Sequence, residues 1–473
     1  MAILRKKAIT ILLILTLLIT PSITPVNAES GYGLNSWHHK YINTKDAWNL
    51  LDKFAPNNKP VLVASIDTGV NLRSDSEVYY DMKPNLDLDN CVKISADGSA
   101  VKYVGKKPKH NHGTSSALII GSSSNNYDEL VGVAAGNRNN IVRLMCINVS
   151  TEIRNDYCKN RVRDTTPENI IAGMNYAVEH GARIIHMCLG HNKNYKDAYG
   201  RKFDVKKIQK AIDNIVENHP NVIIIASAGN KNSTKTWYMG DYKGVCSIIN
   251  SSHYTNIYSK NTKASSSNFG KDKEFSAPGK GIAGLNNKNY GGTSAASAVA
   301  AGVAALIIYA NPKLSSSQVR QIMSSTAIDL YKDGFDIYTG SGNLNAYNGV
   351  IKALNLAGNT DLPSIIKRKF VDMDPIKLSG KKEGKAIKLK WSKAKTTAGH
   401  LNQYRIYVKT RIDGTYRQLT IKKASETSYT YKPKELKKVY YFKVKPFGTT
   451  YDGKSFTISD DDSEKNVVEI KTK

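Results

Sequence analysis

The sequence predicts an α/β fold, with a doubly wound, mostly parallel sheet covered by helices on both faces, followed by a small all-β sandwich. Between residues 59 and 357, short apolar runs alternate with helical patterns. These runs lack polar alternation, which is typical of strands covered on both faces. From residue 376 onward the helical patterns end, and alternation with a period of two residues indicates antiparallel strands.

The N-terminal segment has the features of a secretory signal peptide. Residues 5–7 are basic, residues 9–19 are almost wholly apolar, and residues 26–28 offer small side chains for cleavage. A signal anchor that stays in the membrane is the alternative, but the apolar run is short for a span of about 20 residues. We expect cleavage after Ala28, a secreted or extracellular mature chain, and no transmembrane anchor.

The elements of the first domain follow from two kinds of pattern. Apolar residues at helical spacing predict helices over 167–179 and 205–217. Strands that alternate with helices connect by right-handed crossovers, which makes neighbouring strands parallel. Continuous apolar runs predict the strands over 61–66, 141–147, 182–189 and 222–226.

A change of composition divides the chain. Residues 358–363 are turn-like, and Lys367-Arg368-Lys369 is a charged run, so we predict a linker here. Beyond it, three runs alternate between apolar and polar side chains, as in an antiparallel sandwich: 386–391, 404–409 and 440–444. The predicted organisation is a signal peptide over 1–28, an α/β domain over 29–357, a linker over 358–375 and a β-sandwich over 376–473.

The net charge of the chain limits the classes of partner that we expect. The 473 residues include 68 Lys and Arg against 40 Asp and Glu, a net charge of +28, and from residue 367 onward 27 basic and 12 acidic residues give +15. Such an excess favours anionic partners: nucleic acid, membranes or cell-wall polymers. Export lowers the expectation of nucleic acid. We therefore expect no nucleic-acid partner and an anionic cell-wall or surface polymer bound by the basic C-terminal domain.

Cysteine usage argues against a disulfide-dense protein. The chain has 5 Cys and no C-x-x-C pair, so at least one thiol is unpaired and a zinc or redox motif is not indicated. Cys188 and Cys246 lie in apolar, strand-like runs. We expect both to be buried thiols of the core.

Two residues are candidates for an acid–base pair. Asp67 directly follows the first predicted strand, and functional residues collect beyond the carboxyl ends of parallel strands. His112 opens a run of small and apolar residues that predicts a helix packed on the sheet. Taken alone, Asp67 is more commonly a turn residue, and His112 an ordinary core or surface histidine. A metal site with His110 lacks a third ligand at a telling spacing.

Two more residues are candidates for a nucleophile and an amide donor. Asn230 ends the run after the strand over 222–226, where its side chain can donate to a developing oxyanion. Ser294 follows Gly291-Gly292-Thr293 and precedes a helix rich in alanine. Alone, Asn230 fits a turn and Ser294 fits a helix N-cap. A phosphate loop is not indicated, because no Lys follows the glycines.

The four candidates together supply every role of acyl transfer. Ser294 would attack a carbonyl, His112 would move the proton, and Asp67 would hold the imidazole and stabilise its charged form. Asn230 and the Ser294 N–H would bind the oxyanion. This chemistry requires no cofactor.

These segments resemble the subtilisin-like serine peptidases over residues 45–350. Asp67-Thr68-Gly69, His112-Gly113-Thr114 and Gly292-Thr293-Ser294 match the three catalytic signatures of that family in order, and Ala228-Gly229-Asn230 matches its oxyanion segment. The resemblance implies a subtilisin-like peptidase domain over 29–357 that acts on protein or peptide substrates. It also implies that Cys188, Leu189 and Gly190, with Ser227, Ala228 and Gly229, border the main specificity cleft.

The sequence departs from the family at several points. Ser115 stands where the family commonly has His, and Ala295 and Ala298 stand where it has Met and Pro. The stretch from residue 29 to about residue 60 is too short for the usual pro-segment, so we expect unaided folding or an outside helper. Structural calcium is plausible from the family, but no acidic cluster assigns a site, so the metal residues stay unknown.

The C-terminal segment resembles a fibronectin type III domain. Trp391 fits the buried strand tryptophan, Tyr404 and Tyr407 fit the next strand, and Tyr440 or Tyr441 fits the corner tyrosine. The expected function of the whole chain is therefore a secreted serine endopeptidase with a sandwich appendage. A weakly active or inactive surface binding protein on the same scaffold, or a processing protease of narrow specificity, are the alternatives.

Overall fold

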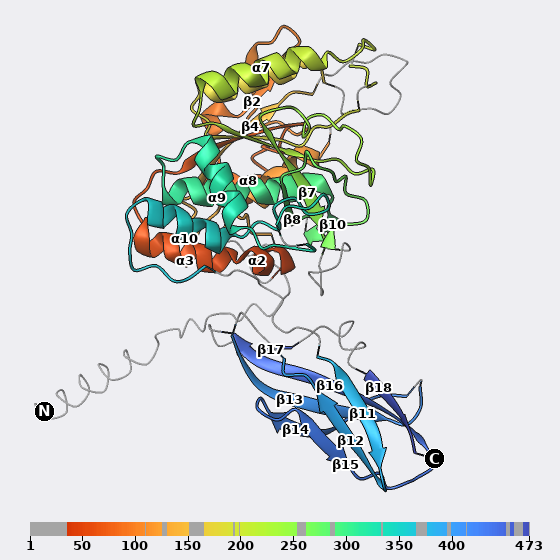
Figure 1. Cartoon of the computed structure of the whole chain (residues 1–473). Coiled ribbons are helices and arrows are strands. Elements are labelled where there is room, and N and C mark those ends of the chain that lie inside the picture. The colour runs from red at the N-terminus through yellow and green to blue at the C-terminus, as the bar shows by residue number, and fades with distance from the viewer. Residues whose placement is uncertain are drawn as a thin grey trace, which may run out of the picture.

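The structure of the protein is a computed structural model of the whole chain (Figure 1). The expected signal peptide over 1–28 lies outside the residues that it describes, as do residues 366–375 of the expected linker. The described residues are 36–108, 110–124, 130–150, 165–192, 194–197, 199–252, 262–283, 289–332, 334–365, 376–394, 399–412, 414–450, 455–457 and 467–472.

The first domain is built on an eight-stranded sheet with the order β3-β2-β4-β1-β5-β6-β7-β8. Neighbouring strands are parallel throughout, apart from the antiparallel pair β2 and β3. This confirms the predicted doubly wound, mostly parallel sheet. The strands are β1 (Val61–Asp67), β2 (Val92–Ile94), β3 (Ala100–Lys102), β4 (Val142–Asn148), β5 (Ile184–Met187), β6 (Ile223–Ser227), β7 (Val245–Ser251) and β8 (Phe275–Pro278).

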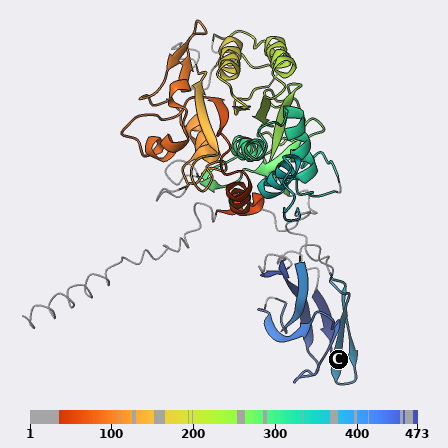
Figure 2. The same ribbon diagram turned by 90° about the vertical axis from the view of Figure 1, so that its left-hand side faces the viewer.

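Helices cover both faces of this sheet (Figures 1 and 2). One face packs against α6 (Pro167–Glu179) and α7 (Val205–Asn218), and the other against α5 (His112–Gly121) and α8 (Thr293–Ala310), with α3 (Thr44–Phe54) and α10 (Ala346–Leu356) beyond α8. Side chains of a strand alternate between the faces. Val63 of β1 accordingly joins the α8 side of the core, and Ala64 joins the α6 side.

Helix α8 occupies the centre of the domain. All 18 of its residues are buried. Among the described helices it alone is long and apolar enough to cross a membrane, but a helix wholly enclosed by its own domain is explained as a core helix. The remaining elements are α2 (Trp37–Ile42), α4 (Glu77–Met82), α9 (Ser316–Thr326), two short 3₁₀ helices at Lys83–Asn85 and Leu88–Asn90, and the hairpin of β9 (Ile282–Ala283) and β10 (Asn289–Tyr290).

The C-terminal residues form two antiparallel sheets, which confirms the predicted change to an all-β region. One sheet has the order β11-β12-β15, and the other has the order β14-β13-β16-β17, with β18 also paired to β16. Ile387, Leu389 and Phe442, all fully buried, lie in the core between them. The strands are β11 (Leu378–Glu383), β12 (Ala386–Trp391), β13 (Gly399–Lys409), β14 (Arg417–Lys423), β15 (Ser428–Tyr431), β16 (Val439–Thr450), β17 (Ser455–Thr457) and β18 (Val467–Lys471).

Candidate active site

Strand alternation determines which way Asp67 points. It is the last residue of β1, an even number of positions from Val61 and Val63, which both contact the α8 side of the core. Asp67 therefore projects toward α5 and α8. His112 is the first residue of α5 and Ser294 the second of α8. Since these two helices pack together, one strand end and two helix starts meet at one point.

The three side chains form a continuous hydrogen-bonded row. Nδ1 of His112 lies 2.8 Å and 2.9 Å from the two carboxylate oxygens of Asp67. Nε2 of the same ring lies 3.1 Å from Oγ of Ser294. A carboxylate only accepts, so Nδ1 carries the proton and Nε2 is left to accept from the serine hydroxyl. This is the tautomer in which an imidazole can serve as a base toward Ser294.

The surroundings of Asp67 keep its carboxylate ionised. Its side chain is 2% exposed. Burial by itself raises the pKa, but the charge and hydrogen bond of His112 and the N–H of Thr68, at 2.7 Å, outweigh it, so that the pKa of Asp67 is lowered. An ionised carboxylate in this position stabilises a positive charge on His112.

Asn230 is oriented by the start of α8. Its Oδ1 accepts from the backbone N–H of Thr293 at 2.9 Å and from the Thr293 hydroxyl at 3.2 Å. Gly292 permits this approach, since a β-carbon there would lie 3.0 Å from Oδ1. The amide NH₂ of Asn230 is thereby turned away from Thr293. The N–H of Ser294 is one of the first four of the helix, which have no acceptor within it, so two donors are available beside the serine.

A buried polar cluster lies beneath Ser294. The Cys188 thiol donates to the Ser294 carbonyl at 3.3 Å and lies 3.1 Å from Nε2 of His186. Ser297 Oγ also donates to that carbonyl, at 2.9 Å. Burial raises the pKa of Cys188 to about 12 and lowers the pKa of His186 to about 4, so both groups are neutral at pH 7. The cluster holds the first turn of α8 without adding charge.

The residues expected to border a cleft lie at the ends of two adjacent strands. Cys188, Leu189 and Gly190 follow β5, and Ser227, Ala228 and Gly229 end or follow β6. The thiol of Cys188 points into the cluster just described, and Ser227 and Ala228 are buried. Gly190 is exposed, and Leu189 is partly buried. Gly229 is buried, so of these six residues only Leu189 and Gly190 reach the surface.

Sequence reasoning missed three residues of this region: Thr293 as the partner of Asn230, Tyr290, and Trp237. The Tyr290 ring packs edge-on against His112, with centroids 5.8 Å apart, and its hydroxyl lies 2.9 Å from Ser116 Oγ. The Trp237 ring contacts Gly190 and Gly229. Thr293 could have been found from the sequence, because it directly precedes Ser294. Tyr290 ends the two-residue strand β10 and Trp237 lies in a connecting segment, and neither is long enough to show a pattern.

The described residues bear on the expectations for metal ligands and for cysteines. Within the described ranges, no three His, Cys, Asp or Glu side chains gather to hold a metal ion, so no calcium site is assigned. Cys91, Cys146, Cys188 and Cys246 are buried free thiols, and Cys158 lies outside the described residues.

Comparison with known proteins places this geometry in a family. The model of the subtilase family matches residues 58–353. The minor extracellular protease Epr of Bacillus subtilis is 26% identical over 320 residues, which cover 66% of this chain and 41% of that protein. The cell wall-associated protease of the same organism is 27% identical over 458 residues, covering 89% of this chain and 44% of that protein. The chain thus spans about two fifths of the length of these relatives.

A solved structure supports the fold. A protease from Pseudoalteromonas arctica PAMC 21717 superposes with a TM-score of 0.50 at 20% sequence identity, over 67% of this chain and 96% of that one. The family match covers more than half of the 473 residues and contains Asp67, His112, Asn230 and Ser294. The chain therefore belongs to the subtilase family.

Proposed function

We propose that the chain is a secreted serine endopeptidase that hydrolyses peptide bonds in protein substrates. Membership of the subtilase family makes it a peptidase by class. The observation that carries the finer proposal is the unbroken row from Asp67 through His112 to Ser294. Relatives described as extracellular and cell wall-associated proteases support secretion, with retention at the cell surface.

The proposed reaction uses the row in sequence. The Ser294 hydroxyl attacks the scissile carbonyl while Nε2 of His112 takes its proton, which then passes to the leaving amine. Asp67 keeps Nδ1 protonated and stabilises the imidazolium. The Asn230 amide and the Ser294 N–H bind the oxyanion, and water then hydrolyses the acyl-enzyme by the same route.

A comparison of the secreted parent with a Ser294→Ala variant tests this proposal. Both are expressed as the full chain and incubated with unfolded casein and with a fluorophosphonate probe that labels activated serines. We expect the parent alone to cleave and to be labelled. Ser317→Ala, at an exposed serine of α9, is the matched control and should behave as the parent. A folded parent that neither cleaves nor labels would favour the binding-protein alternative.

We propose that the C-terminal sandwich is of the fibronectin type III kind. Its strand orders, β11-β12-β15 and β14-β13-β16-β18, support this. Trp391 on β12 packs edge-on against Tyr404, with centroids 5.4 Å apart. Near the start of β16, the Tyr440 hydroxyl donates to the carbonyl of Glu435 at 2.7 Å, as a corner tyrosine does. That bond favours Tyr440 over Tyr441 for the role.

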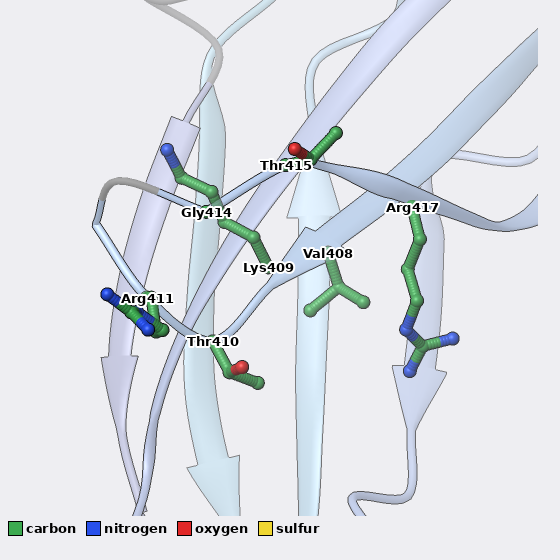
Figure 3. A pocket seen from close by; sticks show the side chains of 7 residues that line it. All are labelled: Val408, Lys409, Thr410, Arg411, Gly414, Thr415 and Arg417. Carbon is green, nitrogen blue, oxygen red and sulfur yellow. The ribbon is translucent and has the colours of Figure 1, made fainter.

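We also propose that this domain binds an anionic cell-wall polymer. A surface hollow of about 250 Å³ lies at the end of the β13–β14 hairpin, lined by Lys409, Arg411 and Arg417 (Figure 3). Its cationic side chains suit an anionic ligand.

Pelleting with purified anionic cell walls tests the polymer proposal. Charge reversal to Glu at Lys409, Arg411 and Arg417 should abolish the binding. The same reversal at three exposed α7-region lysines, Lys202, Lys206 and Lys210, should not. Binding of the parent should weaken as salt rises, because salt screens surface charge. Equal pelleting of the two triple variants would contradict the proposal.

A further inference from the structure

The indole ring of Trp237 is packed between two glycines. A β-carbon built at Gly190 would lie 2.2 Å from Nε1 of Trp237, and one built at Gly229 would lie 2.6 Å from its Cγ. Real β-carbons do not approach other atoms below 3.0 Å. Any side chain at either glycine would displace the ring. The indole is therefore in direct contact with the backbone at both glycines.

These glycines face each other across the gap between two adjacent strands. The pairing of β5 with β6 runs from Ile184 with Ile223 to Met187 with Ala226. The same spacing three residues further on brings Gly190 level with Gly229. Beyond the last pair the two chain segments separate. The segment after β6 continues along β7, where the N–H of Ala228 donates to the carbonyl of Ile248 at 3.1 Å. The segment after β5 no longer pairs with it, and His191 pairs with Tyr238. The ring fills the opening between the diverging ends.

The opening adjoins the nucleophile. Gly229 precedes Asn230, and its N–H donates to the Thr293 hydroxyl at 3.1 Å, while Cys188 contacts the carbonyl of Ser294. When Ser294 attacks a substrate carbonyl that Asn230 binds, the substrate residue carrying that carbonyl must lie against these backbone segments. The side chain of that residue then points at the opening that Trp237 fills.

The backbone of Trp237 is held by a turn. The backbone N–H of Trp237 donates to the Asp241 carboxylate at 2.8 Å, and the N–H of Asp241 donates to the Trp237 carbonyl at 3.1 Å. Asp241 is ion-paired with Lys273, and the two side chains are 7% and 2% exposed. A buried, paired carboxylate fixes the turn strongly, because breaking such a pair leaves an uncompensated charge. The turn that carries the ring is therefore fixed, which keeps the indole beside the two glycines.

We propose that Trp237 determines specificity by closing the cleft to large side chains, so that the enzyme cleaves after glycine, alanine and other small residues. This inference rests on the proposed peptidase function and deepens it by naming the substrate class.

Two peptide p-nitroanilides that differ only at the last residue, Ala or Phe, test the proposal. We expect the parent to prefer Ala over Phe in kcat/KM by at least about 100-fold, since even one misplaced methylene group changes selectivity by about 10–200-fold. In Trp237→Ala the ratio should fall by about the same factor, through a gain on Phe. Trp37→Ala, at a tryptophan that donates to Lys280 instead, is the matched control and should keep the parental ratio.

The outcomes separate the two proposals. Fluorophosphonate labelling first reports whether Ser294 is active: an unlabelled parent overturns the peptidase function and this inference with it. A labelled parent that cleaves after Phe as readily as after Ala overturns the specificity proposal alone. So does a labelled Trp237→Ala variant with an unchanged ratio. Should that variant fail to fold, Trp237→Phe keeps an aromatic ring and should shift the ratio by a smaller factor in the same direction.

Discussion

The two faces of the large sheet are covered by helices of opposite character. Helix α8 is buried along its whole length, whereas α7 buries only Ile208, Ile212 and Ile215 fully and exposes most of its other residues to solvent. Asp67, His112 and Ser294 all belong to the α8 side. A helix without a solvent face has to fit its neighbours at every position, so its first turn cannot shift independently of the core. The comparison teaches that the hydrogen-bonded row of these three residues lies in the least adjustable part of the domain.

The largest expected difference between the faces is catalytic. His112→Ala should lower kcat on casein-derived peptides by about 10⁴-fold or more, because the base for Ser294 is lost. His180→Ala, at an exposed histidine just after α6 that bonds only to Tyr176 in its own helix, should leave kcat unchanged. Comparable losses in both variants would show that the two faces do not differ in this way.

Next in size is the effect at Asn230. Asn230→Ala should lower kcat by about 10²–10³-fold with little change in KM, since an oxyanion donor acts mainly in the transition state. Asn214→Ala, at an exposed asparagine of α7, supplies the comparison and should be silent. Steady-state kinetics on one peptide substrate decides the matter, and a change confined to KM would argue against an oxyanion role.

Acid should weaken the α8 side. Burial lowers the pKa of His39 and of His186 to about 4 from 6.5. Below pH 6.5 these two histidines therefore bind protons in the unfolded chain, whereas in the folded protein they stay neutral down to about pH 4. Stability is complete above pH 6.5 and falls toward pH 4, by about 1.4 kcal/mol per pH unit for each histidine.

Urea unfolding of the inactive Ser294→Ala protein at pH 7.5, 5.5 and 4.5 measures that slope. Adding His39→Gln should reduce the pH dependence of the unfolding free energy by the contribution of one histidine. The loss of the hydrogen bonds of His39 to Thr44 and Val131 lowers the stability equally at every pH and does not change that slope. His180→Gln should leave the slope unchanged. An identical slope in the His39 variant would place the acid sensitivity elsewhere.

The smallest expected difference concerns packing. Ala300→Leu inserts three carbons into the fully buried α8 and should destabilise the fold by about 1–3 kcal/mol. Ala211→Leu makes the same change on α7, at a residue that lies partly buried at the edge of the core, and should destabilise the fold less than Ala300→Leu does. Thermal unfolding of both proteins provides the measurement. Equal tolerance at the two sites would mean that α8 is less tightly enclosed than described.

Sequence patterns predicted the frame of the domain closely where elements are long or strongly periodic. The helix expected over 167–179 is α6, and the helix expected over 205–217 is α7 with one further residue. The strand expected over 182–189 is shorter, because β5 ends at Met187 and Cys188 turns toward Ser294. Strands β2, β3 and β8, of three or four residues each, are too short to show a pattern.

The site was predictable in part for the same reason. Asp67, His112, Asn230 and Ser294 each adjoin a strand end or helix start, and the topology of a parallel sheet brings such positions together. Trp237 had no comparable signal. Its position depends on contacts with Gly190 and Gly229, which lie 47 and 8 positions earlier in the chain, and on an ion pair between Asp241 and Lys273. Such contacts exist only once the fold has formed.

The reactivity of the Cys188 thiol can report local opening of the protein. The thiol lies between the nucleophile's helix and the sheet, with its hydrogen bond to the Ser294 carbonyl and its burial both shielding it from solvent. Reaction of a buried thiol with a reagent requires local opening of the core around α8 and β5. The rate at which Cys188 is alkylated therefore reports how often the reaction centre comes apart, a quantity that turnover measurements do not contain.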